Sequence, residues 1–145
     1  MKKKLILLLL VCFSLASAEQ LVLTPLESRP TVRGNAENFS GSVLVDFLFR
    51  PGEQTRASGA VVTFEPGART NWHSHPNGQT MIVTSGMGWI QAWGEERLTV
   101  KPGDVVWSPP NVKHWHGATS THCLSHLVVQ ESQDGSPVKW MEPVS

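Results

Sequence analysis

Glycine and proline residues interrupt this chain at close intervals, and almost no segment between them has the period of a helix. The 145 residues include 12 glycines and 10 prolines, and the apolar residues between these turn formers run in short blocks or alternate with polar ones. We expect strands at residues 41–49, 58–65, 79–84, 88–92, 96–100, 104–108, 113–117 and 121–130. Many short strands separated by turns predict an all-β fold, either a sandwich or a barrel.

The N-terminus has the pattern of a secretory signal. Residues 2–4 are lysines, residues 5–15 are almost wholly apolar, and Ala16-Ser17-Ala18 supplies small residues for cleavage. The apolar stretch is short for a bilayer span, so residues 1–18 are interpreted as a cleavable signal peptide, with an uncleaved anchor as the alternative. We therefore expect a periplasmic or secreted protein that starts at Glu19 and has no membrane contact after cleavage.

The remaining 127 residues form one domain of ordinary size, since no repeat, low-complexity tract or linker divides them. We assign residues 19–58 to an N-terminal segment with the first barrel strands, and residues 59–145 to the core. Loss of three lysines leaves nine basic and twelve acidic side chains, a net charge of −3, with no basic patch to predict nucleic-acid binding. Cys123 is then the last remaining cysteine, which excludes internal disulfides; a buried, inert thiol is expected there.

Two His-X-His pairs provide the candidate ligands. His73 and His75 lie two residues apart, so their side chains point to the same side of an extended chain. A Pro-Asn-Gly turn at residues 76–78 follows, after which Gln79 shares a face with Met81 and Val83. His114 and His116 repeat the spacing on a later strand.

A fifth histidine, His126, shares strand parity with Val128 and Gln130, and His122 has the same parity. Imidazole is a poor core group unless its nitrogens are satisfied. Five or six inward-facing histidines therefore indicate a metal or catalytic site rather than packing.

At this point the motifs resemble those of the cupin family. The segment from Gly67 through "HSHPNGQ" to Gly86 is similar to the first cupin motif, and the segment from Gly103 through Pro109 to His114 is similar to the second. The resemblance covers about residues 59–131. It implies a cupin-type β-barrel, that is, a double-stranded β-helix or jelly roll. It also implies one divalent metal ion held by four residues: His73, His75, Gln79 and His114.

The sequence departs from the family pattern at three positions. Gln79 stands where the family usually has glutamate, Asn111 replaces a turn glycine, and Ala118 replaces a frequent asparagine. Asparagine tolerates left-handed geometry, so we expect the turn at Asn111 to survive. Three imidazoles and an amide form a neutral shell, in which a divalent ion keeps its full formal charge. We expect manganese, with iron, nickel or zinc as alternatives.

A narrower resemblance is to the cupin-type hydroxynitrile lyases and the small single-domain (monocupin) proteins around them. It rests on "FEPGART" and "WHSHPNGQT" within residues 64–80, "PGDVVW" at 102–107, "KHWHGA" at 113–118 and "KWMEPV" at 139–144. It implies that His126 acts as the general acid and base, a role that suits a histidine. Ala60, Val62 and His116 would line the substrate pocket, with Gln130 near its mouth.

Three functions remain open at this stage. The first is a metal-dependent lyase or decarboxylase acting on a small carbonyl or hydroxy compound, and the second is a metal-dependent dioxygenase. The third is a non-catalytic module that binds a small molecule. Fold alone cannot separate them. The resemblance also implies a homodimer or homotetramer.

Overall fold

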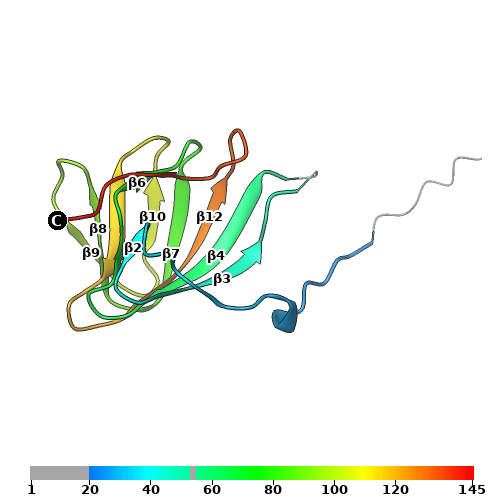
Figure 1. The fold of residues 1–145 in the computed structure, drawn as a ribbon, viewed down its shortest axis with the longest axis horizontal. Helices are drawn as coiled ribbons and strands as arrows, with labels where there is room; N and C mark the ends of the chain where they lie inside the picture. Colours follow the sequence, from blue (N-terminus) through cyan, green and yellow to red (C-terminus); the bar gives the residue numbers. More distant parts are fainter. Residues whose placement is uncertain (1–19, 53–54) are drawn as a thin grey trace, which may run out of the picture.

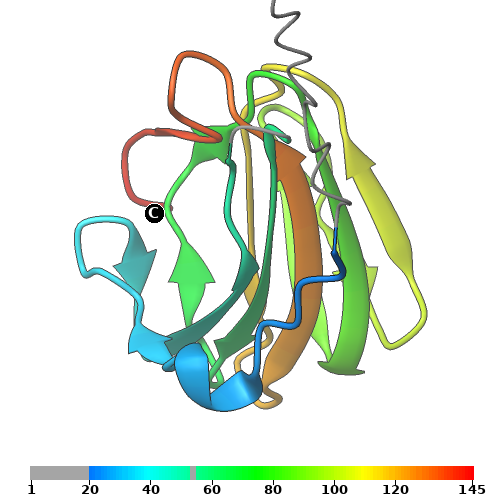
Figure 2. The same cartoon turned by 90° about the vertical axis from the view of Figure 1, so that its right-hand side faces the viewer.

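The chain folds into two β-sheets that face each other and enclose the core. The structure, a computed structural model, describes residues 20–52 and 55–145, so the expected signal peptide and the start at Glu19 lie outside the described residues. Figures 1 and 2 show the two sheets curving toward each other, with the first described residues leading away from the barrel beyond the strands at its edge. No helix in this part of the chain is long and apolar enough to cross a membrane.

The first sheet has six strands. In spatial order they are β1 (Val32–Arg33), β3 (Val43–Phe49), β4 (Ala57–Phe64), β12 (Leu124–Glu131), β7 (Gln79–Gly86) and β10 (Val105–Ser108). All neighbouring strands in it are antiparallel. The long central strand β12 pairs with both β4 and β7, so residues from three strands share one inner face.

The second sheet has seven strands, most of them short. Its main order is β13 (Lys139–Trp140), β6 (His73–Ser74), β11 (His114–Ala118), β5 (Arg69–Thr70) and β2 (Phe39–Ser40). Off this path, β8 (Gly88–Ala92) pairs with β11 and with β9 (Leu98–Val100). The one helix among the described residues is a 3-10 turn, η1 (Leu26–Ser28).

The inner faces of both sheets form an apolar core. Phe64 and Leu124 are fully buried, and Met81 and Val83 on β7 are almost so. These residues belong to one cluster that also contains Val62 and Val128. Because strand residues alternate between faces, this pattern places Gln79, His126 and Gln130 on the same inner side as the core, where the polar site begins.

The expected strands agree closely with the observed ones. Each of the eight expected segments contains a strand, and the shared inner face of Gln79, Met81 and Val83 is confirmed. The turn at Asn111 is also confirmed, since that residue has a φ of 63°. The Pro-Asn-Gly turn carries the chain from β6 in one sheet to β7 in the other.

Two expectations for the segment before β12 are wrong. His122 is exposed and lies near the Thr121 hydroxyl, with 2.9 Å between Nδ1 and Oγ1, because β12 begins only at Leu124. Cys123 is exposed rather than buried, for the same reason. The inward parity of the strand therefore does not extend back to residue 122.

Candidate metal centre

The site lies between the two sheets and draws side chains from both. His73 on β6 and His114 on β11 are paired residues in one sheet, and Gln79 on β7 and Gln130 on β12 are paired residues in the other. His75 lies in the turn that connects the sheets, where its carbonyl oxygen accepts hydrogen bonds from the backbone N–H groups of Gly78 and Asn111. The fold thus brings together residues that are more than 30 positions apart in sequence.

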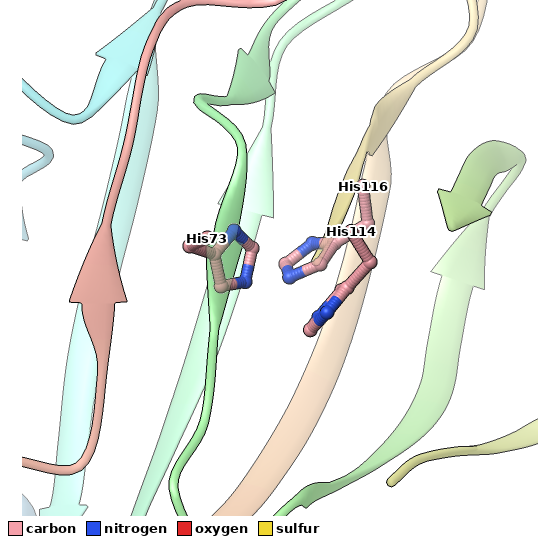
Figure 3. A group of neighbouring side chains, drawn as sticks. All are labelled: His73, His114 and His116. Carbon is pink, nitrogen blue, oxygen red and sulfur yellow. The ribbon is translucent and has the colours of Figure 1, made fainter. Parts of the chain in front are cut away.

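The cluster contains five buried histidines: His73, His75, His114, His116 and His126. One ring nitrogen from each of His73, His114 and His116 lies within 4.8 Å of the others (Figure 3). The ring centre of His75 is 5.1 Å from that of His73 and 5.5 Å from that of His114. Distance alone therefore groups His116 with the ligands, although the sequence predicted it as a pocket residue.

Hydrogen bonding separates the roles of these histidines. Nδ1 of His73, His75 and His114 lies 3.0, 2.8 and 2.9 Å from the carbonyl oxygens of residues 71, 137 and 112, respectively. A carbonyl only accepts, so each Nδ1 must carry the proton and each Nε2 keeps its lone pair. This is the arrangement that outer hydrogen bonds impose on metal-binding histidines.

The remaining two histidines bond to each other instead. Nε2 of His126 lies 3.1 Å from Nδ1 of His116, so one ring donates and the other accepts. Nδ1 of His126 is buried without a partner among the described residues, and a proton there would be an unsatisfied donor. The proton is better placed on Nε2 of His126, which leaves His116 protonated on its own Nε2. His116 then offers the site a donor rather than a lone pair.

Three of the buried acceptor atoms without a partner belong to residues predicted as metal ligands. Nε2 of His75, Nε2 of His114 and Oε1 of Gln79 are buried and make no hydrogen bond with any described residue. Buried acceptors without donors are costly, and a cation would satisfy all three. The residues present therefore fit a divalent metal ion, with the imidazole and amide ligands suited to manganese, iron, nickel or zinc alike.

Burial keeps the histidines of the site neutral. It lowers the pKa of His75 to about 4 and that of His126 to about 4. It also lowers the pKa of His73 and His116 well below the ordinary value, with the neighbouring imidazoles adding to the effect. Neutral imidazole is the form that binds a metal ion or accepts a proton.

A cavity of about 350 Å³ opens beside these groups. Its lining includes Ala60, Val62, His116, His126 and Gln130, together with His73, His75 and Gln79. The sequence thus identified the histidines and glutamines of this lining but not its other polar residues, which are Arg33, Asn35, Asn38 and Thr70. His114 is not among the lining residues. Phe39 and Phe47 add apolar side chains to the lining. The sequence motifs do not predict this, because both residues lie in the N-terminal part of the chain, before the first motif.

The matching family model is a cupin domain and spans residues 60–129. The chain is 51% identical over 118 residues to a protein of Granulicella tundricola described as (R)-mandelonitrile lyase, covering 81% of this chain and 90% of that protein. The chain belongs to the cupin family. Its similarity to the lyase includes nearly the full length of that relative.

Solved structures agree with this assignment. A cupin-like protein from Thermotoga maritima is 41% identical, with a TM-score of 0.74, over 78% of this cupin and 86% of that chain. The polyketide cyclase RemF from Streptomyces resistomycificus is 17% identical, with a TM-score of 0.67, over 84% of this cupin and 86% of that chain. At that lower identity the likeness shows the fold alone.

Proposed function

We propose that this cupin is a metal-dependent enzyme that acts on a small carbonyl or hydroxy compound in the manner of a hydroxynitrile lyase. The observation that carries the proposal is its 51% identity to a relative described as (R)-mandelonitrile lyase. The buried histidine cluster and the adjoining apolar pocket support it. The substrate would be a small aldehyde or the corresponding cyanohydrin, with its hydrocarbon part against the apolar wall.

In this proposal His73, His75, His114 and Gln79 hold one divalent ion, with manganese first among the candidates. When bound, the ion supplies a Lewis acid that polarises an oxygen of the substrate. The lone pairs of His75 and His114 and the unpaired amide oxygen of Gln79 support this ligand set. His116 stays outside it because its Nδ1 accepts a hydrogen bond from His126, so its Nε2 carries a proton and has no lone pair for the ion.

The His116–His126 pair handles the proton. The reaction joins hydrogen cyanide to an aldehyde, so the proton of hydrogen cyanide must leave carbon and reach the aldehyde oxygen. The pair, linked at 3.1 Å through Nε2 of His126 and Nδ1 of His116, takes up that proton and returns it to the oxygen. It is neutral at the start and at the end, as burial favours. Val62 on β4 pairs with His126 on β12, and Ala60 pairs with Val128. Both β4 residues bound the space beside the histidine pair.

The test is cyanohydrin formation from benzaldehyde and cyanide by protein loaded with Mn²⁺. We expect activity in the wild type and loss of most of it in His126→Ala, with the metal content unchanged. His122→Ala is the matched control, because His122 is exposed and outside the site. A His126→Ala variant as active as the wild type would exclude the proposed proton carrier. Oxygen consumption without cyanohydrin would favour a dioxygenase instead.

We also propose that the protein is exported after cleavage before Glu19 and assembles as a homodimer or homotetramer. The lysine-rich start and apolar stretch of the sequence support export.

Exposed apolar side chains in the segment that leaves the barrel support assembly. These are Leu21, Val22 and Leu23, which are 104, 89 and 86% exposed, and a second copy would cover such side chains. Mass spectrometry of the periplasmic fraction and light scattering test these two proposals. An intact Met1 in membrane pellets, or a monomer at all concentrations, would contradict them.

A further inference from the structure

Two glutamines meet at the edge of the metal centre. Gln79 on β7 and Gln130 on β12 are directly opposite each other in the antiparallel ladder, so their side chains share the inner face of the sheet. Nε2 of Gln79 donates a hydrogen bond to Oε1 of Gln130, with 2.8 Å between the two atoms. Gln79 is only 4% exposed, and both side chains line the cavity.

In the observed arrangement, this bond leaves the oxygen end of the Gln79 amide free. Because Nε2 is engaged by Gln130, Oε1 is left as a buried acceptor without a partner among the described residues. Two of the neighbouring imidazoles also present unpaired lone pairs, at Nε2 of His75 and of His114. In this orientation, therefore, the cluster contains buried acceptors that a cation would satisfy.

The opposite orientation would satisfy the cluster without a cation. The two ends of an amide have nearly the same shape, so hydrogen bonding decides which end faces inward. If both amides turned over, Nε2 of Gln130 would donate to Oε1 of Gln79, and the NH₂ group of Gln79 would face the imidazole lone pairs. Such an arrangement would offer donors to the histidines and no oxygen ligand to a metal ion.

We propose that Gln130 is a positioning residue that holds the amide of Gln79 with its oxygen toward the metal ion. The inference rests on the metal site of the proposed function. It assigns to Gln130 a task beyond lining the pocket: its Oε1 accepts from the NH₂ group of Gln79, which could otherwise turn inward. Partners of metal ligands act in this way, and their loss typically weakens metal binding by about 10- to 100-fold.

A double-mutant cycle separates orientation from packing. Gln130→Met keeps the length of the side chain but removes the strong acceptor, and we expect it to weaken Mn²⁺ and Zn²⁺ binding by about tenfold. In the Gln79→Glu background both ends of the side chain are oxygens, so no orientation has to be selected. There, Gln130→Met should not weaken binding at all. Gln133→Met is the matched control, because Gln133 is exposed.

The dissociation constants for Mn²⁺ and Zn²⁺ are measured by competition with a chelating dye on the four proteins of the cycle, with circular dichroism as the check on folding. Weakening in the wild-type background alone supports the inference. Equal weakening of metal binding in both backgrounds would show that Gln130 acts by packing, and no weakening in either would show that it has no role. Either result would overturn the inference. If the wild type itself takes up neither ion, the proposed metal site fails, and the inference fails with it.

Discussion

At the scale of single residues, environment rather than residue type decides what a histidine does in this cupin. His75 is 2% exposed, and its Nδ1 donates to the carbonyl oxygen of Pro137. His122 is exposed and lies near the hydroxyl of Thr121 instead. Only the first has a lone pair that is both buried and unpaired. The two histidines therefore form a matched pair for testing the metal site.

His75→Ala should abolish metal binding. It removes one imidazole from a shell without a charged ligand, so we expect about one divalent ion per wild-type chain and almost none in the variant. Elemental analysis of protein purified without chelators measures this directly. His122→Ala should keep the wild-type content, and equal metal in the wild type and His75→Ala would remove His75 from the ligand set.

Gln79→Glu tests the neutral shell. The substitution keeps the size of the side chain but adds a negative charge, so binding of Mn²⁺ should be at least as tight as in the wild type. The carboxylate also donates more charge to the ion and makes it a weaker Lewis acid. We expect slower cyanohydrin turnover at neutral pH and a rate optimum at higher pH, measured as a pH–rate profile. Faster turnover at every pH would contradict this account.

At the scale of elements, the two ends of β7 decide where its inward residues lie. The strand follows Gly78 and ends at Gly86, and both glycines have positive φ, at 77° and 79°. A Cβ atom at Gly86 would lie 1.9 Å from the carbonyl oxygen of Cys123. This close approach brings the end of β7 against the start of β12, and a register shift between Ser125 and His126 then pairs Gln79 with Gln130.

Gly86→Ala should destabilise the protein by about 3 kcal/mol or more, because it adds both a backbone clash and an unfavourable φ. Gly94→Ala is the matched control. Gly94 has a φ of 82° and nothing within 4 Å of an added Cβ, so its substitution should cost about 1–2 kcal/mol, from left-handed geometry alone. Urea denaturation monitored by tryptophan fluorescence gives both values. Equal losses would show that the approach to Cys123 is unimportant.

The sequence predicts the long strands well and the short ones poorly. Alternation identifies β4, β7 and β12, whereas β5 and β6 have only two residues each and carry no readable period. The hydrogen bond between Gln79 and Gln130 also cannot be predicted from the sequence, because it depends on the register of two strands about 50 residues apart. The exposure of Cys123 does not follow from its residue type, because it depends on where β12 begins, at Leu124.

At the scale of the whole molecule, the buried histidines tie stability to pH. Burial lowers the pKa of His73, His75, His114, His116 and His126 below the ordinary 6.5. The unfolded chain therefore binds protons at these positions more readily than the folded one. Above pH 6.5 neither state is protonated there, and these groups have no effect. As the pH falls below 6.5, the unfolded state gains protons and the folded state loses stability.

We expect the melting temperature of chelator-treated, metal-free protein to fall steadily between pH 6.5 and about pH 4. His75 and His126 take up protons in the folded state near the lower limit, where their pKa lies at about 4, so their contribution levels off there. His126→Phe removes one of the five groups and should flatten the fall, whereas His122→Ala should leave it unchanged, because His122 is exposed. Calorimetry across this range measures the slopes. A His126→Phe profile as steep as that of the wild type would show that the burial of His126 does not limit stability in acid.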